Sequence, residues 1–262
     1  MSRGRDPLPG LSRRSLILLA AASYLASGCG GTLQEQTGGI ADYERGKKSY
    51  DETNWADAAL DLKAFVEAYP GTERTDDALY YLGDAYFRMK DYALASGQFD
   101  RLLRDFPSSL YEADARFLLA RCDDLQSHGA MLDQTETERA ITRYREFLGA
   151  HADHPRAAEA TARIAALRDR LAEKRFKSGR LYTRLHEFAA ADRYLRGIIA
   201  DYPDSRWAAD AALLLAETLV SRGRRAEALE TLRLIPPGLA RAETQRKIDE
   251  QRRALESDGG SR

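Results

Sequence analysis

The chain is poor in cysteine, in proline and in long apolar runs. Its two cysteines among 262 residues are too few for a disulfide framework or a four-thiolate zinc site. Its 40 basic and 41 acidic residues nearly cancel, so the basic surface that nucleic-acid binding needs is missing and no nucleic-acid partner is expected. The mean hydropathy of −0.53 leaves no room for a bundle of membrane helices. A body rich in Ala, Leu, Arg and Glu instead predicts an all-α protein.

Residues 1–28 are expected to form a signal peptide. Arginines precede an apolar run from Leu16 to Ala26, which is too short to span a bilayer, since that takes about 20 residues. The run ends in Ala26-Ser27-Gly28-Cys29, which resembles a bacterial lipobox, where the cysteine becomes the lipidated N-terminus of the mature chain. The alternative is an ordinary secretory signal with an incidental cysteine.

A lipid on Cys29 predicts a protein that is anchored to a membrane and does not span it, because two or more acyl chains hold a domain stably. By resemblance to proteobacterial sorting, Gly30 favours the outer membrane. The SRRSL stretch at residues 12–16 also resembles a twin-arginine signal, although a pair of arginines is common in plain signal peptides. Residues 29–39 are expected to be a flexible tether. Apart from the covalent lipid, no cofactor is expected.

A repeated pattern runs through the rest of the chain. Its three clearest copies each contain a glycine, an alanine, a large apolar residue and a proline at the same spacing: Gly46, Ala58, Leu62 and Pro70; Gly83, Ala95, Phe99 and Pro107; Gly179, Ala191, Leu195 and Pro203. The pattern resembles the tetratricopeptide repeat, a helix–turn–helix of about 34 residues. We expect the glycine and alanine to lie where the two helices approach closely, and the proline to stop the second helix.

Two weaker copies complete the array. The third repeat contains Ala120 and Ala140 and is interrupted around residues 128–137, and the fifth contains Ala216 and Ala228. Five copies exceed the roughly three that a solenoid needs to bury a continuous core. The expected fold is therefore an all-α, right-handed superhelical solenoid.

The spacing between copies also predicts where the solenoid departs from regularity. The alanines of the third and fourth repeats lie 51 residues apart rather than 37, and residues 155–185 carry apolar residues at helical spacing, which predicts one long helix. The fifth repeat is cut short by the proline pair at 236–237. The repeat domain should cover residues 40–238, with a tail at 239–262 that is either a short helix or disordered.

The whole arrangement resembles the BamD family, the tetratricopeptide-repeat lipoproteins of the β-barrel assembly machinery. The features that carry the resemblance are the lipobox, the five repeats, the insertion at residues 133–135, the IAALRDRLAE segment at 164–173 and the YPDS turn at 202–205. The resemblance covers about residues 40–235. It implies a periplasm-facing protein anchored to the outer membrane, with unfolded outer-membrane proteins, the barrel insertase's periplasmic domain and other assembly lipoproteins as partners.

No catalytic constellation accompanies the repeats. The nucleophile-elbow, Walker, dinucleotide-binding and zincin motifs are absent from the sequence, so the chain is predicted not to be an enzyme. His151 and His154 lack an obvious third ligand, so we interpret them as solvated loop residues and expect no metal site. Cys122 is expected to be a buried thiol. The acidic pairs at 76–77 and 123–124 are interpreted as helix-end or solvated charges.

The concave face of a solenoid, lined mainly by the first helix of each repeat, is the expected binding surface. Positions three before and four after the repeat glycines hold aromatic residues, with two cations close by, and the groove candidates are Tyr43, Lys47, Tyr50, Tyr80, Phe87, Arg88 and Phe117. Such a groove would suit an extended peptide with aromatic side chains and a terminal carboxylate. For each ring the alternative of packing between neighbouring repeats stays open.

The family resemblance divides the work between the two ends of the solenoid. It implies that the N-terminal repeats receive the C-terminal signal of unfolded barrel proteins and that the C-terminal repeats dock the insertase. Arg193 and Arg196 are the docking candidates, and an exposed basic pair on a solvated face is the alternative. A second function also stays open, a generic envelope scaffold for cell division or peptidoglycan remodelling. Such scaffolds typically carry an N-terminal coiled coil, which this chain lacks before Ala41.

Overall fold

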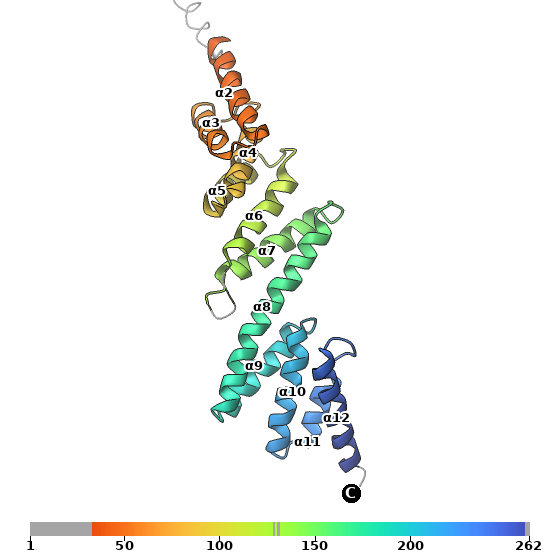
Figure 1. Cartoon of the computed structure of the whole chain (residues 1–262). Coiled ribbons are helices and arrows are strands. Elements are labelled where there is room, and N and C mark those ends of the chain that lie inside the picture. Colours follow the sequence, from red (N-terminus) through yellow and green to blue (C-terminus); the bar gives the residue numbers. More distant parts are fainter. Residues whose placement is uncertain (1–32, 128, 130–131, 260–262) are drawn as a thin grey trace, which may run out of the picture.

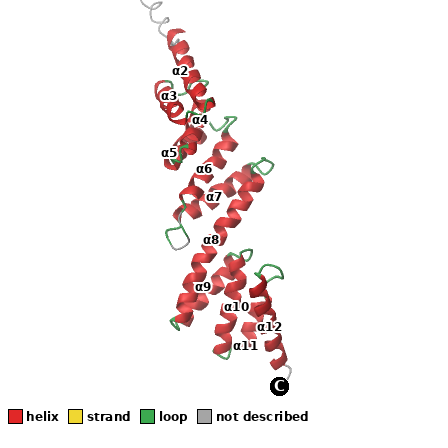
Figure 2. Cartoon of the chain, viewed as in Figure 1, coloured by secondary structure: helices red, strands yellow, loops and turns green. Residues whose placement is uncertain are grey.

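Helices form the regular structure throughout the part of the chain that is described. The computed structural model describes residues 33–127, 129 and 132–259, and these contain eleven helices and no strand (Figure 2). The helices are α2 (Leu33–Asp51), α3 (Trp55–Ala68), α4 (Thr75–Arg88), α5 (Tyr92–Asp105), α6 (Glu112–Gln126), α7 (Thr135–Ala150), α8 (Ala157–Arg184), α9 (Phe188–Asp201), α10 (Arg206–Ser221), α11 (Arg225–Arg233) and α12 (Ala242–Gly259). The predicted all-α tetratricopeptide-type solenoid is confirmed.

Each helix packs mainly on its neighbours in the sequence, which produces an elongated stack (Figure 1). The stack begins with α2 at one end and finishes with α12 at the other, and α8 runs through its middle. The first helices of the five repeats, here called A helices, are α2, α4, α6, α8 and α10. The second helices, called B helices, are α3, α5, α7, α9 and α11.

Small residues hold the two helices of a repeat close together, as predicted. A Cβ atom built on the A-helix glycine would lie within 3 Å of a B-helix side chain, in the pairs Gly46 with Leu62 (2.8 Å), Gly83 with Phe99 (2.7 Å) and Gly179 with Leu195 (2.8 Å). The B-helix alanines Ala58, Ala95 and Ala191 are fully buried. A larger side chain at these positions would push the helices apart, because the interior is close-packed.

The long helix predicted between the third and fourth repeats is α8, with 28 residues. Its first half lies against the third repeat, where Arg163 Nε donates to Asp124 of α6 at 2.7 Å. Its second half forms the A helix of the fourth repeat, with Gly179 against Leu195 of α9. The helix α8 therefore joins an N-terminal part, α2–α7, to a C-terminal part, α9–α12.

The two ends of the chain differ from expectation in where helices begin. Residues 33–39, expected within the flexible tether, form the first turns of α2 because Leu, Gln and Glu favour helix and Gly39 lies against the Tyr69 ring. The signal peptide and Cys29 lie outside the described residues. In the tail, for which helix and disorder were both open, α12 buries Ile248 and Leu255 against α10 and α11.

The acidic pair at 123–124 also departs from the prediction, because it is buried rather than solvated. Arginines surround both carboxylates: Arg139 and Arg143 reach Asp123 at 2.7 and 3.0 Å, and Arg121 and Arg163 each reach Asp124 at 2.7 Å. The buried Tyr144 hydroxyl donates to Asp124 at 3.2 Å. Buried carboxylates persist only when paired, so this network ties α6 to α7 and α8.

Candidate functional site

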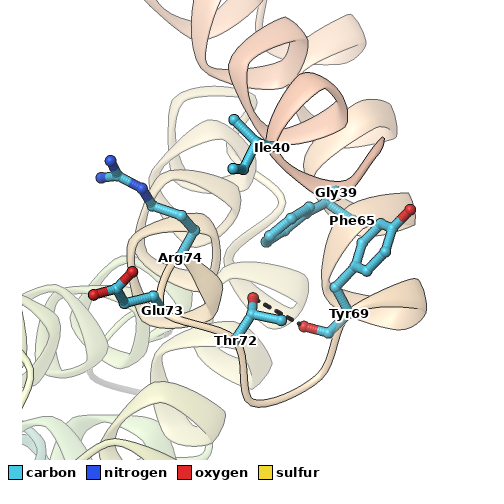
Figure 3. A pocket seen from close by; sticks show the side chains of 7 residues that line it. All are labelled: Gly39, Ile40, Phe65, Tyr69, Thr72, Glu73 and Arg74. Atoms are coloured by element: carbon cyan, nitrogen blue, oxygen red, sulfur yellow. Dashed lines mark hydrogen bonds between the residues drawn. The ribbon is translucent and has the colours of Figure 1, made fainter. Parts of the chain in front are cut away.

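A cavity lies at the N-terminal end of the solenoid, between α2, α3 and the turn that leads into α4 (Figure 3). It has a volume of about 490 Å³. Its lining, which we call the N-terminal cavity, consists of Gly39, Ile40, Phe65, Tyr69, Thr72, Glu73 and Arg74. In Figure 3 the Phe65 and Tyr69 rings stand on one side of the hollow and Ile40 and Arg74 on another. The site is therefore an open apolar hollow with one cation, Arg74, and one anion, Glu73, beside it.

Local packing explains the shape of the N-terminal cavity. A Cβ atom on Gly39 would lie 3.2 Å from the Tyr69 ring, so the absent side chain is what lets α2 approach this ring. Phe65 and Tyr69 are one helical turn apart on α3, with ring centroids 5.4 Å apart. The turn itself is held by Thr75, whose hydroxyl donates to the Tyr69 carbonyl at 2.9 Å. Ile40, in contrast, keeps 55% of its surface exposed.

The electrostatics of the cavity centre on Arg74. Its Nη1 atom lies 3.3 Å from Asp77, and its guanidinium stands 5.6 Å from the Tyr43 ring centroid. The Tyr43 hydroxyl also donates to Asp77 at 3.3 Å, and burial, reinforced by this carboxylate, raises the pKa of Tyr43. The Arg74 side chain remains about half exposed. It is therefore able to turn toward a carboxylate in the cavity.

Two of the predicted groove residues belong to the core instead. Tyr43 is 4% exposed and packs against Phe65, while Phe117 is 2% exposed and packs against Tyr144 and Phe147. The prediction that these two rings line an accessible groove is wrong. The physical reason is that each ring faces the B helix of its own repeat, where Tyr43 contacts Phe65 of α3 and Phe117 contacts Tyr144 and Phe147 of α7.

The other groove candidates are half-buried or exposed on the N-terminal repeats. The Tyr50 hydroxyl donates to Asp84, a buried carboxylate that also accepts from Arg88 at 3.1 Å. Tyr80 stacks on Tyr111 with centroids 4.3 Å apart, and burial raises the pKa of Tyr80 to about 12. The remaining contacts are Phe87 against Tyr92 at 5.5 Å and Lys47 above the Tyr81 ring at 4.7 Å. These residues form an aromatic surface on the N-terminal repeats, and their binding role stays a prediction.

Sequence reasoning missed the seven residues of the N-terminal cavity. It used the Tyr69-Pro70 pair only as a marker of the repeat, although a ring at the end of a B helix, next to a turn, was a usable signal. The exposed Ile40, one turn before Tyr43, was the second signal. Both were overlooked because the prediction started from the repeat glycines and not from the edges of the array.

The docking candidates lie on α9, at the other end of the molecule. Arg193 is exposed, and Arg196 lies 3.4 Å from Glu227 of α11. Arg196 borders a hollow of about 370 Å³ between α9 and α11. Leu234 lines the same hollow with 67% of its surface exposed. The structure thus brings Arg196, but not Arg193, to a hollow with an exposed apolar residue.

The remaining titratable residues form no further site in the described part of the chain. Cys122 is fully buried, as predicted, and burial raises the pKa of its thiol to about 12. His151 and His154 are half-buried against Phe147 rather than solvated. Among described residues no group of three or more His, Cys, Asp and Glu side chains is placed to hold a metal. No described helix is both long and apolar enough to cross a bilayer.

A stack of helical hairpins with open hollows at its two ends defines the class, a tetratricopeptide-repeat binding protein. Comparison with known proteins identifies the family within that class. Residues 39–234 match the family model described as YfiO, outer membrane lipoprotein, and the chain belongs to this family. The resemblance found in the sequence is thereby confirmed.

Curated relatives agree with this assignment. Outer membrane protein assembly factor BamD from Haemophilus influenzae is 23% identical over 233 residues, which cover 85% of this chain and 89% of that protein. BamD from Caulobacter vibrioides is 25% identical, with 82% of this chain and 73% of that protein covered. A solved structure of a tetratricopeptide-repeat protein from Bacteroides fragilis is 13% identical, and the match covers 84% of this chain and 98% of that protein. Its TM-score of 0.45 is too low to establish a shared fold. The fold class rests on the helices themselves.

Proposed function

We propose that the protein is an outer-membrane protein assembly factor that holds a segment of an unfolded β-barrel client at its N-terminal end and docks the barrel insertase at its C-terminal end. Its relatives from Haemophilus influenzae and Caulobacter vibrioides carry the name of outer membrane protein assembly factor, which supports the general role. Client binding is supported by one observation above the others, the N-terminal cavity.

The chemistry of the N-terminal cavity suits the end of an extended peptide. Ile40, Phe65 and Tyr69 offer apolar surface to an aromatic side chain, and burying such a side chain contributes about 1.5–3 kcal/mol. Arg74 offers a planar cation to a carboxylate at the same place, where a charge-assisted hydrogen bond forms. A C-terminal aromatic residue carries both groups. The neighbouring rings Tyr50, Tyr80 and Phe87 would then contact the preceding residues of the client.

The hollow between α9 and α11 is the proposed dock for the insertase. Arg196 is already paired with Glu227, so a partner carboxylate would compete for a guanidinium that is half exposed. The exposed Leu234 supplies the apolar contact that such a polar rim needs. Arg193, which lies outside the hollow, would act at its margin.

We further propose that Cys29 carries lipid and anchors the protein to the outer membrane, facing the periplasm. Only three residues separate Cys29 from Leu33, the start of α2, and these four residue steps span at most about 14 Å. The N-terminal cavity, formed in part by Gly39 and Ile40, would then lie close to the membrane surface. The mechanism is binding, and no step of chemistry is assigned to the protein.

The cavity is tested by fluorescence anisotropy with the purified mature chain and a labelled peptide of about ten residues that alternates aromatic residues and ends in Phe with a free carboxylate. Ile40→Asp should weaken binding about tenfold or more, because it places a charge on the apolar wall. Leu60→Asp, at an exposed leucine of α3 outside the cavity, is the matched control and should leave binding unchanged. Equal binding by all three proteins would contradict the proposal.

A further inference from the structure

A second hollow lies at the junction of the N- and C-terminal parts. It has a volume of about 250 Å³ and is bordered by α7, by α8 and by Tyr202 at the end of α9. We call it the junction groove. It is separate from the N-terminal cavity and from the hollow between α9 and α11.

The junction groove lies beside the first half of α8, which at 28 residues is twice as long as the A helix α4. Between regular repeats, two B helices face each other across an A helix, as α5 and α7 do across α6, and Arg143 reaches Asp100 across that gap at 3.4 Å. The helix α9 instead packs on the second half of α8, so only its last end, with Tyr202, reaches the groove beside α7. The first half of α8 is left without a B helix of this chain across from α7.

The floor of the groove is apolar and rigid. Ile141 of α7, Leu171 of α8 and Tyr202 are each less than a tenth exposed. The Tyr202 ring lies between two guanidinium groups, with Arg168 at 5.2 Å and Arg175 at 4.9 Å from its centroid. Both arginines are paired, Arg168 with Asp204 at 2.6 Å and Arg175 with Asp201. This wall is therefore fixed and electrically balanced.

The rim that α7 contributes is charged and has no ionic partner among the described residues. Glu138, Ile141, Thr142 and Arg145 follow one another along one face of α7 at helical spacing. Glu138 and Arg145 are exposed, and neither forms an ion pair with a described residue. Seven residues of helix place them about 10 Å apart. The groove thus presents an anion, an apolar floor and a cation in line.

We propose that the junction groove docks a helical segment of a partner protein that carries an apolar side chain between a cation and an anion two turns apart. The cation would face Glu138, the anion would face Arg145, and the apolar side chain would fill the hollow over Ile141 and Leu171. The position beside α7, over the first half of α8, is the one that a B helix would take in a regular repeat. A partner helix would therefore complete the packing that the lengthened α8 leaves open.

The test uses the full mature chain in detergent micelles and three labelled alanine-based helical peptides, each with central leucines. One peptide carries Lys and Glu two turns apart, one carries two Glu, and one carries two Lys. The wild type should bind the mixed peptide at least fivefold more tightly than the other two. Arg145→Glu, which makes both rim charges negative, should shift the preference to the two-Lys peptide. Glu138→Arg should shift it to the two-Glu peptide.

Arg180→Glu, an exposed arginine elsewhere on α8, is the control of equal charge change and should keep the wild-type order. If the wild type and Arg145→Glu rank the three peptides in the same order, or if none of the peptides binds, the proposal is overturned. Sedimentation velocity on the same proteins tests whether a second copy of the chain occupies the groove instead. A concentration-dependent dimer that Arg145→Glu dissociates would assign the groove to a second copy of the chain and would also overturn the proposal.

Discussion

The N-terminal and C-terminal parts follow the same helical repeat pattern but are built from different side chains. Helices α2–α7 contain a dense set of rings that contact one another and hydrogen-bond to buried carboxylates, as Tyr50 does to Asp84. After Trp207 the sequence has no aromatic residue, and the core of α10–α12 is made of Ala, Leu and Ile. Aromatic side chains contribute large apolar surfaces that pack in stacked or edge-on arrangements, whereas the aliphatic side chains of α10–α12 are smaller.

The hollows at the two ends differ accordingly in their lining. The N-terminal cavity is lined in part by the Phe65 and Tyr69 rings, and the smaller hollow between α9 and α11 is bordered by charges. Four sets of substitutions should reveal how the two parts differ, beginning with the greatest change in stability.

The buried carboxylate of the N-terminal part should matter most. Asp124→Ala leaves two arginines and the Tyr144 hydroxyl without their acceptor, and should lower the free energy of unfolding by about 3 kcal/mol. Asp192→Ala, in the C-terminal part, removes the partly exposed partner of Arg222 and Arg224 and should cost about 1 kcal/mol. Urea unfolding followed by circular dichroism measures both. Equal losses would show that the two parts are held in the same way.

The second largest difference in stability is expected at the close contacts between the A and B helices of a repeat. Gly83→Ala drives a methyl group into the buried Phe99 ring, and Gly179→Ala drives one into the more adaptable Leu195. We expect a loss of about 2 kcal/mol for the first and about 1 kcal/mol for the second, since overpacking costs about 1–3 kcal/mol and alanine returns helix propensity. The midpoints of thermal unfolding report the order. A larger loss at Gly179 would reverse it.

Substitutions in the turns between A and B helices should change the stability less, and in opposite directions in the two parts. Thr53 holds a φ of 60° in the first repeat, where a β-branched side chain is strained, and Gly223 holds 75° in the fifth. Thr53→Gly should therefore raise the free energy of unfolding by about 0.5 kcal/mol, and Gly223→Ala should lower it by about 1 kcal/mol. Chemical unfolding of the two variants measures both signs. A loss on Thr53→Gly would mean that Thr53 makes stabilising contacts that the turn geometry does not show.

The smallest expected effect is a loss of folding stability at low pH. The Arg168 guanidinium holds the pKa of Asp204 below its ordinary value, so this pair stabilises the fold at pH values above about 4 and loses its contribution as the pH falls further. The pair is exposed, so the contribution should stay below about 1 kcal/mol. Arg168→Leu should flatten the stability between pH 5 and pH 3, measured against the wild type. An unchanged slope would show that the ion pair contributes nothing.

The repeat pattern predicted most of the architecture because its signals are local. A glycine facing a large side chain, a proline after a helix and a repeat spacing of 51 residues each determine one feature of the fold, and α8 was predicted to within two residues. The start of α2 was missed because a glycine pair at 38–39 was taken as a sign of flexibility. It is instead a place where α2 comes close to Tyr69.

The site was less predictable because it depends on which rings are buried. Helical spacing placed Tyr43 and Phe117 on the correct helices but does not distinguish the face toward a neighbouring helix from the face toward solvent. The burial of Asp123 and Asp124 was missed for a related reason. Apart from Arg121 on α6 itself, their arginine partners come from α7 and α8, 16 to 39 residues further along the chain, and no local pattern marks such a pairing.

We propose that the two ends of the solenoid receive different partners. A photo-reactive amino acid placed at Ile40 and, in a second protein, at Leu234 tests this division when the full-length protein is crosslinked in growing cells. Ile40 should crosslink to newly made β-barrel proteins, and Leu234 should crosslink to the insertase. If both positions capture the same partner, or if the two partners are exchanged, the proposed division of function between the two ends is wrong.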